Sequence, residues 1–298
     1  MATGSKYPNM AFAFRNTIRI AEPESFPGSE LSKTLSIEFL PDGFVFSLMD
    51  AKAFKYIALE AFEVKNATNV SEFASQVAGF LEHNPLFSQS FAKAIVSVYS
   101  PYLVLAPGDV TDANKAGRLY STCATLPEGH SLKTEPLHIF DACGIYPVPD
   151  KLIETCEKLF TDYQIRSYGV SMIKNVLASQ KLEKWNADVI IHIKRTHAEV
   201  LLLKQDTLLF YRSFQISCFD DLLYYLFFVL EQYKMNAHHM NAVAMGELPM
   251  DSANFSVLAS FFKDLSLPAR NDAFKYGSGF ESIPGHYYYN LLNLNTCE

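Results

Sequence analysis

Two histidines lie close together in the sequence, at a spacing from which imidazoles can hold a metal ion. His192 belongs to an apolar run, 189–193, and His197 precedes the next apolar run, so the two would face each other across a hairpin turn at Lys194-Arg195. Imidazoles are common zinc ligands, but a closed site needs four ligands and no third one is visible in this stretch. We therefore predict no metal site here, and treat the pair as polar residues beside a turn.

Other chemistry is not favoured by the residue patterns. The sequence has no Gly-x-Ser-x-Gly element and no P-loop, and Gly277-Ser278-Gly279 lacks the strand-to-helix context of a nucleophile turn. The cysteines are odd in number and form no CxxC pair, which favours reduced thiols in a cytoplasmic protein. They are Cys123, Cys143, Cys156, Cys218 and Cys297. We predict no catalytic residue from these patterns.

Composition limits the classes of partner. The chain has 298 residues, enough for two domains of ordinary size, and 49% of them are hydrophobic. Its net charge of -7 disfavours nucleic-acid binding, because phosphate contacts need clustered Lys and Arg. No run is long and apolar enough to predict membrane insertion, and no basic segment leads into an apolar signal sequence. We expect a cytoplasmic protein.

The histidine pair lies in a stretch, Val189 to Gly246, whose pattern predicts a strand order. Three runs rich in β-branched and aromatic residues, joined by short polar turns, predict a meander of antiparallel strands. A helix follows, and 241–245 predicts a further strand that ends at Gly246. A second helix then runs to Phe262. The three meander runs are 189–193, 198–203 and 208–214.

The helix of this stretch is unusually apolar. Ser217 and Asp220 form a capping-box pattern at its start, and apolar residues recur at helical spacing from Phe219 to Leu230. Tyr224 and Phe228 belong to the opposite side of the same helix. A helix that is apolar nearly all round is expected to be buried on more than one face.

An earlier copy of the same order begins near Leu35. Runs at 35–40, 44–49 and 54–62 predict strands, the first two joined by the turn Pro41-Asp42-Gly43, where a glycine tolerates positive φ. A helix at 70–83 and strands at 93–98 and 102–105 follow. We predict two α/β subdomains, 1–145 with an N-terminal arm and 146–298 with a docked aromatic C-terminal tail. Residues 126–136 predict a polar connection.

This duplicated order resembles the actin-like ATPase superfamily, whose members contain two ribonuclease-H-like βββαβα units. The second half looks closest to the pilus-assembly and cell-division branch. More specifically, residues 30–265 resemble a bacterial family known only as a domain of unknown function and grouped with these ATPases. The resemblance is carried by 35–50, 99–107, 208–214 and 219–226.

The resemblance also implies where a nucleotide would bind. Superfamily members that bind ATP use an Asp-x-Gly turn in the first hairpin. The matching turn here is Pro41-Asp42-Gly43, which is one residue tighter, and we favour an ordinary hairpin turn over a phosphate loop. The second phosphate loop corresponds to 192–196, where neither Asp nor Gly occurs, so Cβ atoms block close phosphate approach. In the nucleotide-binding alternative, the Thr196 hydroxyl would bond a phosphate and Lys194 or Arg195 would supply a compensating charge. The adenosine element keeps one glycine, Gly246.

Two functional hypotheses follow from these departures. The first is a non-catalytic scaffold, a pseudo-ATPase that binds a protein partner or a second copy and needs no cofactor. The alternative is a divergent nucleotide-binding protein or phosphotransferase that holds ATP and Mg²⁺ through the residues at 42, 43, 194, 196 and 246. We expect ATP hydrolysis to be absent, because two of the three implied elements are degraded.

Overall fold

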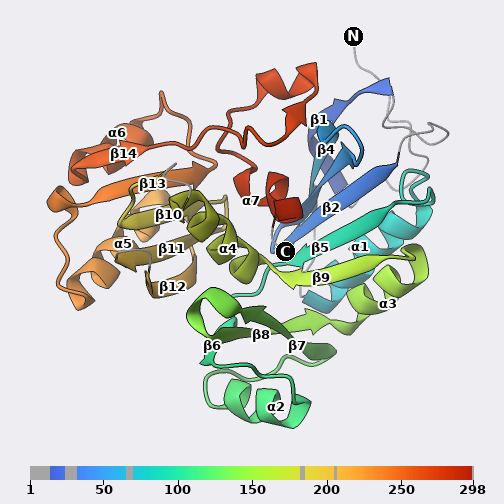
Figure 1. The fold of residues 1–298 in the computed structure, drawn as a ribbon, viewed down its shortest axis with the longest axis horizontal. Coiled ribbons are helices and arrows are strands. Elements are labelled where there is room, and N and C mark those ends of the chain that lie inside the picture. Colours follow the sequence, from blue (N-terminus) through green and yellow to red (C-terminus); the bar gives the residue numbers. More distant parts are fainter. Residues whose placement is uncertain (1–13, 24–31, 65–69, 182–184, 205–206, 297–298) are drawn as a thin grey trace. The chain divides into compact units, whose positions relative to one another are not determined.

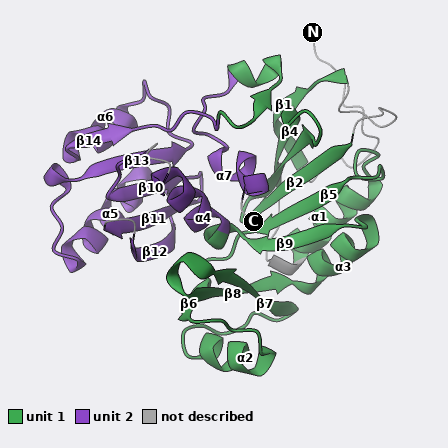
Figure 2. Cartoon of the chain, in the orientation of Figure 1, with its two compact units in different colours: residues 1–170, 272–281 green, residues 171–271, 282–298 purple. Residues whose placement is uncertain are grey.

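The chain divides into two compact units. The computed structural model describes residues 14–23, 32–64, 70–181, 185–204 and 207–296 (Figure 1). Unit 1 comprises residues 1–170 and 272–281, and unit 2 comprises residues 171–271 and 282–298 (Figure 2). The division differs from the predicted boundary at 145/146, which falls inside strand β8 (Ala142–Pro149). Strand β9 (Tyr163–Ser167) still pairs with the sheet of unit 1, and this places the boundary after residue 170.

Unit 1 is built on a mixed sheet whose centre is the predicted meander. The meander strands are β2 (Lys33–Leu40), β3 (Gly43–Asp50) and β4 (Lys55–Val64). β5 (Lys93–Val98) pairs with β2 in parallel and β9 with β5 in parallel, giving the order β4-β3-β2-β5-β9. Two further strands, β1 (Phe14–Ala21) and β15 (Lys275–Tyr276), pair with β4.

The predicted N-terminal arm contains a regular strand. β1 pairs antiparallel with β4 from Phe14 to Ala21, apart from one register shift between Asn16 and Ile18. Arg15 and Arg19 form ion pairs with Glu63 and Glu60 across this edge. Residues 1–13 and 24–31, which the prediction also covered, lie outside the described residues.

Unit 2 repeats the same sheet. Its strands stand in the order β12-β11-β10-β13-β14, with the meander antiparallel and the last two strands parallel. Both sheets thus follow third-second-first-fourth-fifth order, and this confirms the predicted duplicated, ribonuclease-H-like α/β fold. The strands are β10 (Val189–Ile193), β11 (His197–Lys204), β12 (Thr207–Gln215), β13 (Asn241–Gly246) and β14 (Asp264–Ser266).

Helices bury one face of each sheet. In unit 1, α1 (Val70–His83) and α3 (Asp150–Leu159) cover a core in which the ring of Phe44 stacks on Phe62 at 5.0 Å and meets Phe80 at 5.2 Å. In unit 2, α5 (Phe219–Gln232) and α6 (Ala253–Phe261) cover the corresponding face. Helix α4 (Tyr168–Lys181) leads from one unit into the other.

A small insertion follows β5 in unit 1. It contains β6 (Val104–Pro107), α2 (Ala113–Ser121) and β7 (His130–Leu137), and its sheet has the order β6-β8-β7. Strand β7 occupies most of the segment that the sequence predicted as a polar connection. Its side chains are largely exposed because it is an edge strand, so its polar composition concealed the strand.

The start of α5 and the C-terminal tail differ in detail from the prediction. Cys218, not Ser217, is the N-cap, and the Asp221 carboxylate accepts from the N–H groups of Ser217 and Cys218 at 2.7 and 3.2 Å. The tail docks in unit 2 through a short helix, α7 (Tyr289–Leu292), where the hydroxyls of Tyr289 and Ser179 lie 2.8 Å apart. No described helix is long and apolar enough to cross a membrane.

Candidate nucleotide-binding elements

Asp42 and Gly43 lie in the first hairpin of unit 1, where the geometry of the sheet accounts for both residues. Leu40 pairs with Gly43, so Pro41 and Asp42 form a two-residue turn, and the Asp42 carbonyl accepts from the N–H of Val64 at 2.9 Å. Neither Asp42 nor Gly43 has a positive φ, so the predicted reason for a glycine at this position, tolerance of positive φ, is wrong. A Cβ on Gly43 would lie 2.0 Å from the carbonyl oxygen of Phe62, so the glycine lets β4 approach.

The first hairpin of unit 2 turns one residue later than predicted. The N–H of Lys194 donates to the carbonyl of His197 at 2.9 Å, so Arg195 and Thr196 form the turn. This small change moves His192 opposite Glu199 instead of His197. The predicted facing pair of histidines is therefore wrong, although both imidazoles lie close to one carboxylate.

That carboxylate, Glu199, is the centre of a buried polar network on the sheet face opposite α5. His192 Nδ1 lies 2.9 Å from Glu199 Oε2, and the Ser213 hydroxyl donates to Oε1 at 3.1 Å. His197 Nε2 lies 3.5 Å from Oε1. The network links β10, β11 and β12, and all four side chains are buried.

Burial disfavours the charged forms of these groups. It lowers the pKa of His192 well below its usual range, helped by the nearby charge of Lys194, and it lowers the pKa of His197 to about 4. It also raises the pKa of Glu199. Among the described residues, no three His, Cys, Asp or Glu side chains are placed to hold a metal ion. The His192 ring is hydrogen-bonded to Glu199 and the His197 ring lies near the same side chain, so we interpret the network as structural.

The side chain of Lys194, which follows the carboxyl end of β10, is buried. It is only 4% exposed, its Nζ lies 3.8 Å from Glu247 Oε1, and the same Nζ lies 5.0 Å from the centre of the Tyr288 ring. Both contacts come from unit 2 itself. The ammonium group is thus engaged by a carboxylate and an aromatic face.

Gly246 lies beside this lysine, because Ile193 and Gly246 are register partners in the parallel pair β10–β13. Its φ is +89°, and a Cβ there would lie 2.1 Å from the carbonyl oxygen of Ile193. Its N–H donates to the carbonyl of His286 at 2.8 Å, and the imidazole of His286 bonds the carbonyl of Leu248 at 2.9 Å. The ring donates through Nε2–H because a carbonyl oxygen can only accept, and burial lowers the pKa of His286.

The structure therefore groups the predicted residues by unit. Lys194, Thr196 and Gly246 lie at one end of the unit 2 sheet, and Asp42 and Gly43 lie at the first hairpin of unit 1. Sequence reasoning missed Glu199, His286 and the ion pair of Glu247. The charged residue after Gly246 was visible in the sequence, but its pairing with Lys194 depends on the parallel register of β10 and β13.

Comparison with known proteins agrees with the fold. A protein of Bacteroides thetaiotaomicron with actin-like ATPase fold and unknown function is similar, with 17% identity, 90% of this chain and 96% of that chain covered, and a TM-score of 0.68. A chain of the PilM-PilN type IV pilus biogenesis complex matches with 11% identity, 88% and 97% coverage, and a TM-score of 0.59.

At such low identity these likenesses establish the fold alone. No curated protein sequence matches the chain. The family described as "Protein of unknown function (DUF3822)" matches residues 27–265, which is most of the chain. The chain belongs to this family, whose function is unknown, and it has an actin-like ATPase fold.

Proposed function

We propose that this chain is a non-catalytic interaction protein, a pseudo-ATPase that uses the actin-like fold as a scaffold. The observation that carries the proposal is that the Lys194 side chain is buried and its ammonium group already has partners. A lysine that binds phosphate must offer its ammonium group to the ligand, and here the ammonium lies buried between Glu247 and the Tyr288 ring. Moving it to a phosphate would leave Glu247 unpaired beside the ligand, where two negative charges repel each other.

The backbone around Gly246 supports the same proposal. A phosphate cradle needs several N–H groups that point to the ligand. The N–H groups of Gly246 and Glu247 instead donate to the carbonyls of His286 and Ile193, at 2.8 and 2.7 Å. A ligand would have to break two hydrogen bonds that already hold β10, β13 and the C-terminal segment together.

The alternative remains a divergent nucleotide-binding protein or phosphotransferase with ATP and Mg²⁺. It is favoured by the partial exposure of Asp42 and Thr196, one at the first hairpin of each unit. In this alternative Asp42 would hold the metal ion through water and the Thr196 hydroxyl would bond a phosphate.

The partner of a scaffold is proposed to be a protein. The net charge of -7 disfavours a nucleic acid. One structural neighbour comes from a complex of type IV pilus biogenesis, so the fold is found in a protein assembly elsewhere. The cytoplasmic location that the cysteines favour stays a prediction; in the described part of the chain Cys123, Cys143, Cys156 and Cys218 are all free thiols.

Isothermal titration of the full chain with ATP and Mg²⁺ tests the proposal. We expect no saturable heat, and no phosphate release above a protein-free blank. A Kd tighter than about 100 μM, near -5.5 kcal/mol, would contradict it if binding is lost in both Asp42→Ala and Lys194→Ala. The matched control is Asp264→Ala, which removes an exposed carboxylate of unit 2 outside these elements.

A further inference from the structure

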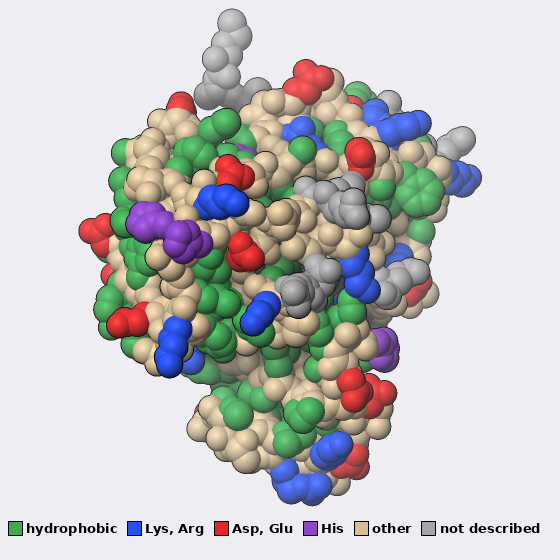
Figure 3. Space-filling view, turned by 60° about the vertical axis from the view of Figure 1, so that its left-hand side comes forward, with side chains coloured by type: hydrophobic (Ala, Val, Ile, Leu, Met, Phe, Trp, Pro, Cys, Tyr) green, Lys and Arg blue, Asp and Glu red, His purple; other side chains and the backbone are tan. Residues whose placement is uncertain are grey.

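Helix α5 exposes aromatic side chains that its sequence predicts to be buried. Its inner face, with Leu222, Leu226 and Val229, packs in the core of unit 2. On the outer face Tyr224 is 67% exposed and Phe228 is 50% exposed. The two rings lie one turn apart and stack at 6.3 Å, forming a ridge along the helix. On the face of the molecule drawn in Figure 3, hydrophobic side chains form patches among charged ones.

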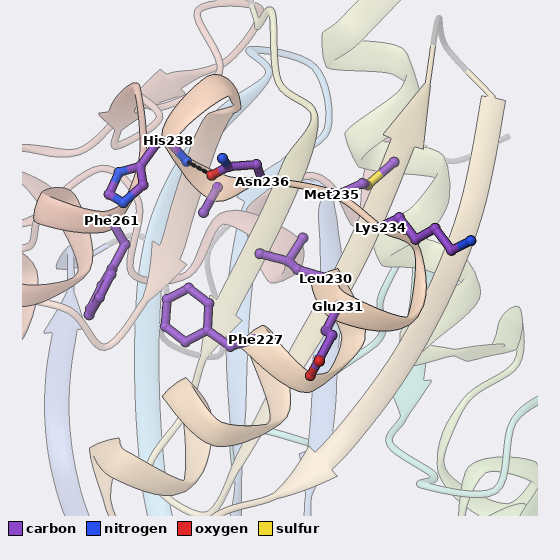
Figure 4. A pocket seen from close by; sticks show the side chains of 9 residues that line it. Phe227, Leu230, Glu231, Lys234, Met235, Asn236, His238 and Phe261 are labelled. Atoms are coloured by element: carbon purple, nitrogen blue, oxygen red, sulfur yellow. Dashed lines mark hydrogen bonds between the residues drawn. The ribbon is translucent and has the colours of Figure 1, made fainter.

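Hollows flank the Tyr224–Phe228 ridge on both sides. One lies between α5 and β12 and is lined by the ridge together with Phe214 and Arg212. Its volume is about 370 Å³, within the range of roughly 300–1,000 Å³ over which protein pockets enclose ligands, so it can take aromatic side chains. The other lies between α5 and α6, where Phe227 and Phe261 meet at 4.7 Å, and it continues past Glu231 (Figure 4).

The strand beside the first hollow is the open edge of the sheet. β12 is the terminal strand in the order of unit 2, nine residues long, with Arg212 as its only charged residue and without proline. Edge strands usually carry charges, prolines or bulges that prevent pairing with another chain. Stacking of Phe214 on Tyr225 at 4.7 Å fixes the wall between this strand and the helix. This edge carries one charge, Arg212, and one register shift opposite Leu202 and Leu203, so it is only partly guarded, and the surface between the strand and the helix is largely apolar.

The charges at the margin of this surface have both signs. Asp220 precedes Tyr224 by one helical turn and Glu231 lies near the other end of α5, whereas Arg212 lines the hollow beside β12 and Lys234 follows the helix. A basic partner would need a uniformly acidic margin. A margin with both signs can instead pair its charges with opposite charges on the same margin of a second copy. Such pairing offsets the repulsion between two chains that each carry a net charge of -7.

We propose that a second copy of this chain docks on this surface with two-fold symmetry. The Tyr224–Phe228 ridge of each copy enters the hollow between α5 and β12 of the other, and Asp220 of one copy approaches Arg212 of the other. A two-fold interface requires one surface to carry both the projecting and the receiving element, and this surface carries both. This inference rests on the proposed scaffold function, because it names the partner of the scaffold. It uses none of the residues of the nucleotide alternative.

Sedimentation velocity of the full chain without nucleotide tests the inference. We expect the mass to rise from one chain to two between about 1 and 100 μM, and the double variant Tyr224→Ser/Phe228→Ser to weaken the dimer at least about tenfold. Both side chains are exposed in the single chain, so the circular dichroism spectrum should stay unchanged, and so should Tm at about 1 μM, where the chain is expected to be monomeric. The matched control is Tyr102→Ser, an exposed tyrosine of unit 1 that is 51% exposed, which should leave the dimer intact.

A charge exchange then tests the arrangement. Arg212→Asp and Asp220→Arg should each weaken the dimer, because each places like charges opposite one another. The combined variant Arg212→Asp/Asp220→Arg should restore it to within a few-fold of the wild type.

Three results would overturn the inference. They are a wild-type chain that stays monomeric, a dimer that survives the ridge variant, and a combined charge variant no tighter than the single ones. In the first two cases another surface or another protein serves the scaffold. Nucleotide binding is measured separately, so failure of the dimer and failure of the proposed function are distinguishable.

Discussion

Replacing Gly246 by alanine should be among the most destabilising single-methyl additions in this chain. Two independent constraints meet at this residue. Its φ of +89° is one that side chains with a Cβ rarely adopt, and the added Cβ would lie 2.1 Å from the carbonyl oxygen of Ile193. That oxygen cannot move freely, because it accepts the N–H of Glu247 at 2.7 Å and belongs to the β10–β13 pair.

The expected loss follows from adding the two effects. A left-handed conformation costs a residue with a Cβ roughly 1–2 kcal/mol. Forcing a methyl group into a closely packed site costs typically about 1–3 kcal/mol. Gly246→Ala should therefore lower the free energy of unfolding by roughly 2–5 kcal/mol, a large share of the stability of an ordinary domain.

Three other glycines separate the two effects. Gly108 has a φ of +69° but open space around its Cβ position, so Gly108→Ala should show the conformational cost alone. Gly43 lacks positive φ but would place its Cβ 2.0 Å from Phe62 O, so Gly43→Ala should show crowding alone. Gly79 lies inside α1 with open space, and Gly79→Ala should stabilise by about 0.5–1 kcal/mol.

Urea unfolding is the assay, because its midpoint and slope can be compared between variants. Far-UV circular dichroism follows both units, and the fluorescence of Trp185, the single tryptophan, follows unit 2, where its ring lies 5.2 Å from Tyr289. The reasoning is refuted if Gly246→Ala loses no more stability than Gly108→Ala. A Gly43→Ala variant as stable as the wild type would refute the crowding argument in unit 1.

Two further perturbations address the cap of α5 and the buried network. Asp221→Ala should lower Tm more than Asp220→Ala does, because only Asp221 accepts the N–H groups of Ser217 and Cys218; equal shifts in thermal unfolding would contradict the observed cap. His197 has a pKa of about 4 when folded and roughly 6.5 when unfolded, so the unfolded chain binds more protons between these values. As pH falls through this window, the wild type should lose stability relative to His197→Gln, by on the order of 3 kcal/mol; a difference that stays constant with pH would show that His197 is not buried as a neutral group.

The strand order was predictable because it depends on features that are local in sequence. Short polar turns between apolar runs require antiparallel neighbours, and a helix between two strands returns the chain for a parallel pairing. These two rules applied twice place β10 between β11 and β13, and β2 between β3 and β5. The bounds of α1 and β5 agree with the prediction to the residue.

The polar network was not predictable, because it depends on register. Shifting the turn from Lys194-Arg195 to Arg195-Thr196 exchanges His197 for Glu199 as the residue opposite His192. Nothing in the local pattern distinguishes the two turns, since all three residues are polar. The interaction of Glu199 with Ser213 depends in addition on the third strand, fourteen positions further along the chain.

The outer face of α5 shows a different kind of mismatch. The sequence predicts burial nearly all round, and the single chain covers only the sides that face the sheet and α6. The pattern is correct about the chemistry of Tyr224 and Phe228 but contains no information about what covers them. A covering partner, proposed above as a second copy, would reconcile the helical pattern with the exposed rings.

The glycines at positions 43 and 246 bear directly on whether the predicted nucleotide elements would hold a ligand. Both occupy places where an ATP-binding relative would use glycine, and this alone would favour a retained site. In each unit, however, a strand carbonyl lies about 2 Å from where the Cβ would be: Phe62 O beside Gly43 and Ile193 O beside Gly246. The sheet therefore requires both glycines whether or not a nucleotide binds. The residues that only phosphate would require are the ones missing from 192–196, and the nearby cation is paired with Glu247. This division between what the fold needs and what a ligand needs favours a scaffold over an ATPase.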